Sequence, residues 1–293
     1  MTDAESHSGA ALGAIAVDGA DAAEFLRAQL TNDVMRLGPD RHFLSGWCDA
    51  KGRTLMVGRI CERNGAYLLI VPREIIPTLL KRLRMFVLRS KVDIADYSDE
   101  LHIVGVSAEN LPPANRCENR GAQQWLGLPE DVDGRARALV ISPAAEHATP
   151  ADGMATDSEA WERHEIDSGI PSIRSATAGL FVPQMLNLHW LMAIDFDKGC
   201  YPGQEVVARL HYRGTLTRRM FRLRWRGTQP AVGDDVIDES GERQGTILRS
   251  APATDSRAEG TALAVLKVRA VNDALTTAGA HLELLALPYA TPD

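Results

Sequence analysis

The sequence lacks any closely spaced pair of cysteines. Its four cysteines are Cys48, Cys61, Cys117 and Cys200. None of them belongs to a Cys-x-x-Cys pair, so the pattern gives no support to a zinc ribbon or a ferredoxin-type cluster site. A permanent metal or cluster on the monomer is not expected, because a stable cluster needs several thiolates placed together. Reduced thiols are expected instead.

Long apolar segments are also missing. No run approaches the roughly 20 residues that a membrane-spanning helix needs. Residues 1–10 are polar and slightly acidic, so they lack the basic start and the apolar middle of a secretory signal. These absences predict a cytoplasmic protein that has no membrane partner.

The chain has no excess of positive charge. Its formal net charge is −7 at pH 7, which argues against a general nucleic-acid coat, so no direct nucleic-acid partner is expected. A local basic site for an anionic ligand is still compatible with this charge. The 45% of hydrophobic and 24% of charged residues are typical of a soluble globular protein. A length of 293 residues predicts two or three compact units.

The most distinctive stretch that is present covers residues 198–205 and reads Lys-Gly-Cys-Tyr-Pro-Gly-Gln-Glu. Gly199 and Gly203 permit backbone torsions and close approaches that a side chain would block. Pro202 is tolerated in the first turn of a helix. We therefore expect a tight turn that is followed by a helix beginning near Pro202 or Gly203.

Cys200 is the candidate reactive group of this stretch. It is predicted to lie just before a helix N-terminus, with Lys198 two residues away, and both neighbours favour the thiolate form of a cysteine. Glu205 falls in the first turn, where the helix dipole favours a carboxylate, and it is expected to pair with Arg209 at i, i+4. The alternative is a glycine-rich turn with an inert, buried cysteine. Spacing alone gives the two readings equal weight.

Strand-like segments dominate the rest of the chain. Strands are predicted at residues 12–17, 43–48, 54–61, 66–71, 101–107, 123–126, 136–142, 221–225, 236–238, 245–248, 262–268 and 282–287. Asn64-Gly65 between two apolar runs is a strong hairpin signal. The short strands near the C-terminus suggest a small antiparallel barrel. The chain is therefore divided into a region of residues 1–214 and a C-terminal domain of residues 215–293.

Three helices are expected before the helix of the motif. Apolar residues at helical spacing predict one helix over residues 22–30 and a second over residues 72–88. A third is predicted to open with a capping box formed by Thr156 and Glu159 and to end near Gly169.

The motif continues over residues 206–209 as Val-Val-Ala-Arg. Residues 198–209 together resemble the hallmark of the YgfZ family. That family is the folate-binding branch of the superfamily of the glycine-cleavage T-protein. The resemblance extends over most of the chain, including the turn at Lys51-Gly52-Arg53 and the C-terminal strands. It implies an α+β, T-protein-like fold, with interleaved N-terminal α+β subdomains around a central folate cleft and a C-terminal antiparallel β-barrel.

The resemblance also implies a function. It points to an accessory protein that binds tetrahydrofolate or a derivative and assists the assembly or repair of iron–sulfur clusters, with a link to tRNA modification. Its partners would be folate and iron–sulfur client or assembly proteins. In this reading Cys200 is a reactive or transiently liganding thiol, and Lys198 activates it or meets an anion. The motif loop that holds them consists of Gly199, Tyr201, Pro202, Gly203, Gln204 and Glu205.

Seven further residues are candidate folate contacts in segments that resemble the family: Lys51, Arg53, Arg89, Asp167, Gln184, Trp190 and Arg209. Arg89 belongs to a basic run over residues 81–91 that would suit an anionic polyglutamate tail. Trp190 has a ring that can stack on a planar heterocycle. Simpler roles are also open to these residues, namely a solvated turn, a solvated helix face or core packing.

One departure from the superfamily bears on mechanism. The aminomethyltransferase branch carries an Asn and then a catalytic Asp just after the strand that corresponds to residues 67–71. Here that place reads Pro72-Arg73-Glu74, and the longer side chain of Glu74 would displace a carboxylate enough to matter. Classical aminomethyl transfer is therefore disfavoured. A folate-dependent aminomethyl or one-carbon transferase remains the alternative, and a protein-interaction scaffold with a vestigial folate pocket is a third reading.

Overall fold

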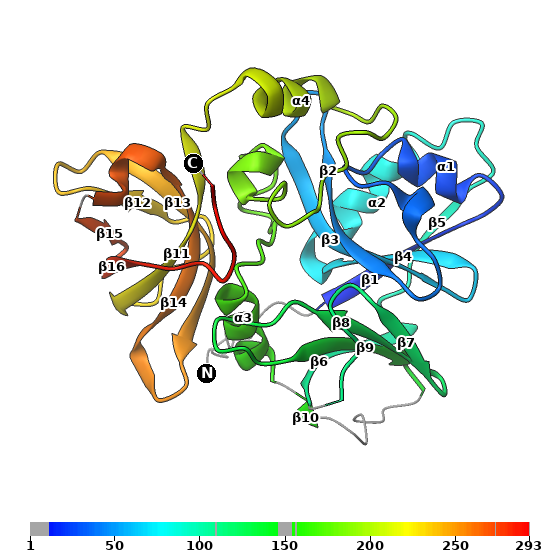
Figure 1. The fold of residues 1–293 in the computed structure, drawn as a ribbon, viewed down its shortest axis with the longest axis horizontal. Helices are drawn as coiled ribbons and strands as arrows, with labels where there is room; N and C mark the ends of the chain where they lie inside the picture. Colours follow the sequence, from blue (N-terminus) through cyan, green and yellow to red (C-terminus); the bar gives the residue numbers. More distant parts are fainter. Residues whose placement is uncertain (1–11, 109, 146–153, 156, 273, 293) are drawn as a thin grey trace, which may run out of the picture.

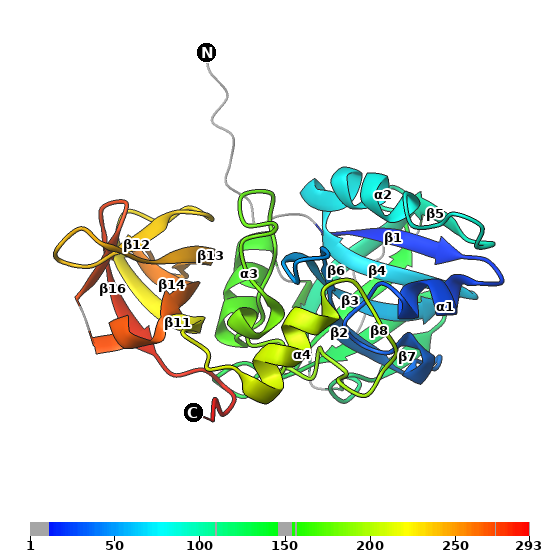
Figure 2. The same cartoon turned by 90° about the horizontal axis from the view of Figure 1, so that it is seen from above.

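The computed structural model describes residues 12–108, 110–145, 154–155, 157–272 and 274–292. Two sheets and a barrel are arranged around α3 (Ser158–Asp167) and the segment that follows it (Figure 1). Seen from above, α3 lies between the barrel on one side and the two sheets on the other (Figure 2). The centre of the molecule is therefore lined by all three bodies.

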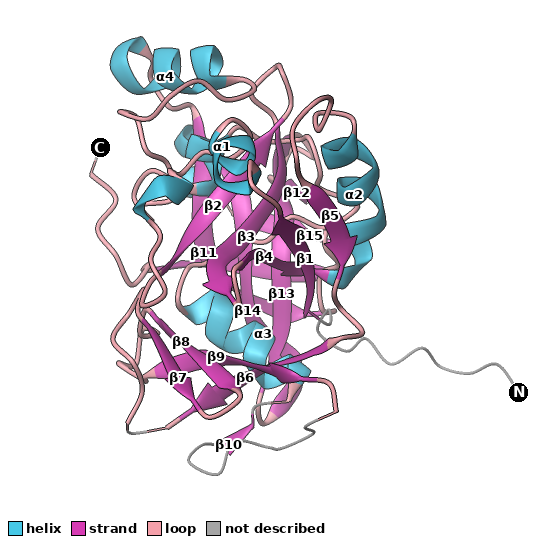
Figure 3. Cartoon of the chain, turned by 90° about the vertical axis from the view of Figure 1, so that its right-hand side faces the viewer, coloured by secondary structure: helices cyan, strands magenta, loops and turns pink. Residues whose placement is uncertain are grey.

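The first sheet is antiparallel, with strand order β2-β3-β4-β1-β5. Its strands are β1 (Leu12–Asp18), β2 (His42–Cys48), β3 (Thr54–Arg63), β4 (Ala66–Pro72) and β5 (Asp93–Asp96). The predicted hairpin is confirmed, because β3 and β4 are joined at Asn64-Gly65 and both residues have positive φ. The helices α1 (Ala22–Arg27) and α2 (Ile76–Arg84) pack their apolar faces on this sheet and form one core with it (Figure 3). Short 3-10 turns, η1 (Val34–Arg36) and η2 (Arg73–Ile75), follow α1 and precede α2.

The second sheet has strand order β10-β6-β9-β8-β7. Its strands are β6 (Leu101–Ser107), β7 (Cys117–Arg120), β8 (Gln123–Leu128), β9 (Arg137–Pro143) and β10 (Met154–Ala155). The two sheets share an apolar core in which Leu68 and Ile70 of β4 meet Leu139 and Ile141 of β9. Alternation along both strands directs these residues to the shared face.

The chain then returns to the first sheet before it enters the barrel. The hydroxyl of Thr31, just after α1, donates to the carbonyl of Ala193 at 2.7 Å. The returning segment contains η3 (Pro183–Leu186) and leads into α4 (Gln204–Arg213). Because residues 12–96 and the later returning segment build one body, with the second sheet inserted between them, the expected interleaving is confirmed.

A closed antiparallel barrel of strand order β11-β14-β13-β12-β15-β16 ends the chain. Its strands are β11 (Arg218–Gly227), β12 (Asp235–Ile237), β13 (Arg243–Ala253), β14 (Ser256–Lys267), β15 (Leu275–Thr277) and β16 (Ala280–Leu285), with η4 (Val268–Asn272) after β14. Trp225 and Ile247 are fully buried in its core. This confirms the α+β fold class and the C-terminal barrel. The division of the chain between residues 214 and 215 falls in the link between α4 and β11 and stays a prediction.

Several local expectations differ from the structure. The helices α1 and α2 are shorter than predicted, because each continues as turns rather than as helix. The short strands β5, β7, β10 and β15 were not expected. At α3 the cap is Asp157, whose carboxylate accepts from the amide of Ala160 at 2.7 Å. The predicted cap, Thr156, lies outside the described residues. Within the described part of the chain, every helix is too short or too polar to span a membrane.

Candidate functional site

The motif forms a glycine-rich turn that runs directly into α4. Gly203 is the N-cap residue and has a φ of 78°, a left-handed conformation that favours glycine. Glu205 lies in the first helical turn, as predicted. The expected ion pair between Glu205 and Arg209 is absent from the described residues, so that prediction is wrong. Both side chains are exposed, and such a helix-surface pair contributes too little to fix two long side chains.

The motif turn packs backbone against backbone on the turn between β2 and β3. A Cβ on Gly203 would lie 2.4 Å from Cα of Gly52 and 2.5 Å from the carbonyl oxygen of Asp49. In return, a Cβ on Gly52 would lie 3.2 Å from the carbonyl oxygen of Gly203 and 3.0 Å from Cβ of Val206. Gly52 and Gly203, which lie far apart in the sequence, therefore bring two family-like segments together as two glycine turns in backbone contact.

Lys198 anchors the motif to the first subdomain. Its ammonium group is buried and donates to the carbonyl oxygens of Arg27 and Leu30, the latter at 2.8 Å. Arg27 is the last residue of α1 and Leu30 lies just beyond it, so the ammonium group is close to the C-terminal end of the helix, where a cation is favourable. Burial is the main cause that lowers the pKa of Lys198 to about 8. The ring of Tyr201 lies 4.8 Å below the Lys198 ammonium and is itself buried.

Cys200 is the exposed cysteine among the four. Cys48 and Cys61 are buried, and burial raises the pKa of the Cys48 thiol to about 12 and raises that of Cys61 further. Cys117 is half-buried, and burial raises its pKa to about 12 as well. Exposure therefore distinguishes Cys200 from the other three thiols, in which burial favours the protonated form.

The predicted folate contacts do not gather in one place. Lys51 and Arg53 lie on the exposed turn that packs against the motif, and Arg53 donates to the carbonyl of Leu180 at 2.9 Å. Arg209 lies on the exposed side of α4. Arg89 is exposed between α2 and β5, at the edge of the first sheet opposite β2.

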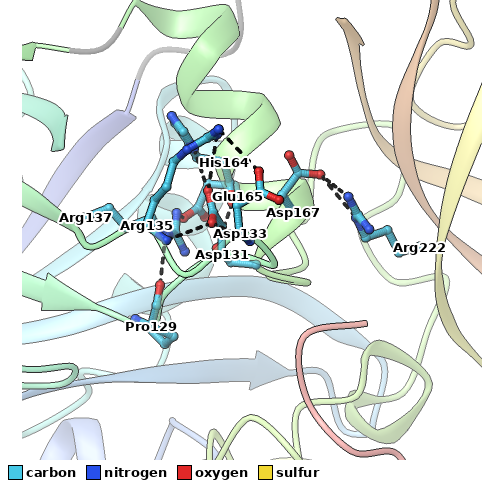
Figure 4. Close-up of polar contacts among 10 residues, drawn as sticks. Pro129, Asp131, Asp133, Arg135, Arg137, His164, Glu165, Asp167 and Arg222 are labelled. Atoms are coloured by element: carbon cyan, nitrogen blue, oxygen red, sulfur yellow. Dashed lines mark hydrogen bonds and ion pairs between the residues drawn. The ribbon is translucent and has the colours of Figure 1, made fainter. Parts of the chain in front are cut away.

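The other three predicted folate contacts, Asp167, Gln184 and Trp190, lie near the barrel. Asp167, at the end of α3, pairs with Arg222 of β11 at 2.7 Å (Figure 4). Gln184 and Trp190 line a common cavity beside α4. The structure thus brings together two pairs of the predicted residues, Lys51 with Arg53 and Gln184 with Trp190. As folate contacts, all seven residues stay predictions.

A buried network of charged side chains at the centre of the molecule was not anticipated from the sequence. It consists of Glu162 and Glu165 on α3 with Arg59, Arg137, Arg174 and Arg249, contributed by β3, β9, the segment after α3 and β13. Arg249 donates two parallel hydrogen bonds of 2.7 Å to Glu162 and also forms an ion pair with Glu165 at 3.2 Å. Arg137 contacts Glu165 at 2.6 Å, as Figure 4 shows. All three bodies of the fold are therefore joined through α3.

The arginines keep both carboxylates ionised. Burial alone would raise the pKa of Glu165, but the guanidinium groups of Arg137 and Arg249 outweigh it and lower the pKa to about 2. The pKa of Glu162 is lowered in the same way, by Arg249 and then Arg174 against the effect of burial. Four guanidinium groups face two carboxylates, so the network holds more positive than negative charge.

A small cavity of about 50 Å³ lies against this network. Its walls include Leu12 and Val57 of the first sheet, Trp161 of α3 and Arg249 of the barrel. Two arginine nitrogens in its lining residues, Nη2 of Arg59 and Nε of Arg174, are buried and have no hydrogen-bond partner. Buried donors of this kind are unfavourable unless a ligand or water accepts from them. The site therefore holds two donors that lack an acceptor, beside the ionised carboxylate of Glu162, which already accepts from Arg249 and Arg174.

One signal in the sequence marks this network. Glu162 and Glu165 share a helix with Trp161 and Ile166, and all four side chains are buried. Carboxylates beside the apolar positions of a helix are rarely buried without a partner. The pattern therefore indicates that buried cations pair with these carboxylates, although it does not identify the arginines that supply them.

Metal ligands do not cluster anywhere in the described part of the chain, where no group of three or more His, Cys, Asp or Glu side chains is placed to hold an ion. The polar ligands of the central site are instead carboxylates and guanidinium groups. Guanidinium groups are donors only and favour anions or carbonyl oxygens.

Comparison with known proteins assigns the family. The chain is 31% identical over 267 residues to the tRNA-modifying protein YgfZ of Colwellia psychrerythraea, which covers 83% of this chain and 80% of the relative. The corresponding protein of Yersinia pseudotuberculosis is 30% identical over 306 residues and covers 94% of this chain and 89% of the relative. The chain belongs to the YgfZ family. The protein of Vibrio atlanticus is 35% identical over 212 residues, which cover 71% of this chain and 65% of the relative.

The fold of this YgfZ-family chain is similar to that of the glycine-cleavage aminomethyltransferase T of Bartonella henselae. The TM-score is 0.75 at 13% identity, over 97% of this chain and 85% of the other. The T-protein-like fold predicted from the sequence is thereby confirmed. No protein-family model matches the chain.

Proposed function

We propose that this protein is a tetrahydrofolate-binding accessory protein that serves the assembly or repair of iron–sulfur clusters and, through it, tRNA modification. Membership of the YgfZ family supports the proposal, since its relatives are named tRNA-modifying proteins. The likeness to an aminomethyltransferase supports a fold suited to a central ligand. The folate and iron–sulfur parts rest on the site geometry and on the motif.

The excess of buried positive charge at the centre is the observation that carries the folate proposal. The unpartnered nitrogens of Arg59 and Arg174 are suited to the carbonyl oxygen of a pteridine ring or to a carboxylate. The carboxylate of Glu162 is suited to the amino group of the same ring. When bound, the folate would supply its one-carbon chemistry, while these residues bind and orient it.

Binding requires the centre to open. The cavity of about 50 Å³ is far below the roughly 300 to 1,000 Å³ of small-molecule sites. Arg174 lies in the segment between α3 and η3, outside helices and strands, so we expect its side chain to be the partner of Glu162 that moves. We expect ligand binding to displace Arg174 from Glu162 while Arg249 keeps its two bonds to that carboxylate.

Calorimetric titration with tetrahydrofolate and its polyglutamate forms tests this proposal. The intact protein is expected to release heat and to gain thermal stability on binding. Arg174→Gln and Glu162→Gln should weaken binding, whereas Glu159→Gln on the same helix should not, because Glu159 pairs with Arg163 and Arg257 away from the cavity. Absence of both heat and thermal shift at millimolar ligand would overturn the folate proposal.

The iron–sulfur role centres on Cys200. An exposed thiol on a turn that is held rigidly by Gly203 against Gly52 is suited to transient contact with a partner. Complementation of a strain that lacks its own family member should fail with Cys200→Ala and succeed with Cys117→Ala. Full complementation by Cys200→Ala would reduce the motif to a structural turn.

The alternative is a folate-dependent aminomethyl or one-carbon transferase. The carboxylate that follows β4 is Glu74, which accepts a hydrogen bond from the amide of Ser175 at 2.7 Å. Through this hydrogen bond, Glu74 positions the segment that contains Arg174. We therefore expect no methylene-tetrahydrofolate from an aminomethyl donor, and its formation at a catalytic rate would favour the transferase.

A further inference from the structure

A second and larger cavity lies beside the motif helix. It has a volume of about 740 Å³ and is lined by Gln184, His189, Trp190, His211, Arg219 and Pro292, among others. These residues come from the returning segment, α4, β11 and the C-terminal tail. None of them lines the central cavity beside Glu162. The volume falls within the roughly 300 to 1,000 Å³ that small-molecule sites occupy.

Gln184, one of the lining residues, carries a buried acceptor that has no hydrogen-bond partner. Its side chain is 2% exposed, and its amide nitrogen donates to the carbonyl of Val207 at 2.6 Å. That bond settles which end of the amide is the oxygen, since a carbonyl accepts only from the nitrogen. The oxygen, Oε1, is buried and has no partner. A ligand with an N–H donor would satisfy it.

Two more unpartnered polar atoms belong to the same lining. Nδ1 of His189 and Nε of Arg219 are both buried without a hydrogen-bond partner. Burial is the main cause that lowers the pKa of His189 to about 4, so its imidazole is neutral at pH 7. Arg219 is charged and donates. The cavity thus combines an acceptor, a cationic donor and a neutral ring nitrogen.

Aromatic rings form the walls around these polar atoms. Trp190 packs against His189 with ring centroids 4.3 Å apart, and the guanidinium group of Arg219 lies 5.7 Å from the Trp190 ring. On the side of α4, His211 stacks on Phe196 at 3.8 Å. Such rings bind flat, delocalised ligands by stacking.

The rim segment, which links α4 to β11, has an exposed arginine at each end, although the chain as a whole is acidic. Arg213 ends α4 and Arg218 begins β11, so the two flank the link that carries the lining residues Gly214, Thr215 and Leu216. Both arginines are exposed, and neither has an ion-pair partner in the described ranges. Unpaired guanidinium groups at a pocket rim favour a phosphate.

We propose that this cavity binds a nucleotide. Its base stacks against Trp190, its exocyclic amino group donates to Oε1 of Gln184, and Arg219 donates to a ring acceptor. Its phosphate lies at the rim formed by Arg213 and Arg218. The shared chemistry is that of a free mononucleotide and of one unstacked nucleotide within an RNA. This site is separate from the folate proposed for the centre.

Titration calorimetry on the full chain with AMP and GMP tests the proposal, with adenosine and ribose 5-phosphate as half-ligands. AMP or GMP should bind more tightly than either half-ligand. Trp190→Ala should weaken binding by about tenfold or more, since that is the scale of one base–aromatic stack. Trp190→Phe, which keeps a ring, should retain most of the affinity and shows that loss in Trp190→Ala is not misfolding.

Arg219→Gln provides the second variant, with Arg224→Gln as its matched control on the same strand. Arg224 pairs with Glu283 on the barrel surface and does not line the cavity. Arg219→Gln should weaken nucleotide binding and Arg224→Gln should leave it unchanged. Both variants should bind tetrahydrofolate like the intact protein, which separates this site from the central one.

A short single-stranded oligoribonucleotide distinguishes the two sources of the ligand. Tight binding of AMP or GMP alone assigns a free nucleotide, whereas binding of the oligoribonucleotide only, with the same dependence on Trp190 and Arg219, assigns a nucleotide within RNA. Both outcomes support the site. It is overturned if neither ligand binds at millimolar concentration, if the variants bind like the intact protein, or if Trp190→Ala abolishes tetrahydrofolate binding instead.

Discussion

The motif turn and the central charge network position the same returning segment by opposite means. At the motif, two glycine turns touch with no side chain between them, and a Cβ on Gly203 has no room. At the centre, long charged side chains such as Arg249 and Glu162 span the space between α3 and the barrel. The motif contact depends on the lack of a Cβ at the glycines, whereas the central contact depends on paired charges.

The two regions tolerate substitution to different degrees. Backbone atoms in contact cannot move aside for an added side chain. Position 203 is therefore restricted to glycine by lack of space and by its positive φ. A charge network can exchange partners, as proposed for Arg174 on ligand binding. We therefore expect the motif to act as a fixed support for Cys200 and the centre to act as the part that responds to a ligand.

Loss of one carboxylate from the network should have the largest effect on stability. Glu165→Gln leaves Arg137 and part of Arg249 buried without a counter-charge, which is expected to lower the free energy of unfolding by about 3–5 kcal/mol. Glu159→Gln is the control on the same helix, where a partly exposed pair contributes at most about 1 kcal/mol. Urea unfolding measures both. Equal effects of the two substitutions would mean that the network does not hold the three bodies together.

Acid should weaken the centre before the motif. The pKa of Glu165 is about 2 in the folded protein, below its value in an unfolded chain, so its contribution is complete above about pH 4.5 and is lost as the pH falls toward 2. The loss is on the order of 3 kcal/mol. Unfolding free energies measured between pH 6 and pH 3 should fall in the intact protein, and the fall should be smaller in Glu165→Gln. Parallel curves for the two proteins would contradict the assignment.

Gly203→Ala should be the next most damaging change. The added Cβ would meet backbone atoms of Gly52 and Asp49 at about 2.5 Å, and backbone cannot move aside as a side chain can. We expect a loss of about 2–3 kcal/mol from overpacking and from the left-handed backbone. Gly199→Ala is the matched control in the same motif, because its Cβ would meet only the guanidinium group of Arg27, at 3.8 Å or more. A destabilisation of similar size in the control would show that the interlock is not the cause.

Cys200→Ser should have the smallest effect on folding. The side chain is exposed, so a change of less than about 0.5 kcal/mol is expected. Alkylation read by mass spectrometry should nevertheless label Cys200 first at neutral pH, because burial raises the pKa values of Cys48, Cys61 and Cys117. Faster labelling of Cys117 would contradict the role of Cys200 as the reactive thiol.

The two regions also differ in how much of their structure can be predicted from the sequence. Within residues 198–205, glycine and proline act on their own neighbours, so the turn, the helix start at Gly203 and the position of Glu205 follow from local rules. The contact of that turn with Gly52 does not follow, because it depends on how the chain returns to the first sheet.

The central network lies beyond local rules altogether. Its members extend from Arg59 to Arg249, and only the buried pair Glu162 and Glu165 leaves a trace in the helical pattern. Trp190 shows the same limit. Its ring is predicted from the sequence to stack on a planar heterocycle, but the structure places it in the cavity beside α4 and not at the centre.

A crystal structure of the protein with tetrahydrofolate would show whether the central charge network binds the folate. We expect a pteridine ring between the first sheet, α3 and β13, with its amino group at Glu162 and with Arg174 moved from its present place. Arg249 should still hold Glu162. Folate density in the cavity beside Trp190, with the central network unchanged, would contradict the account.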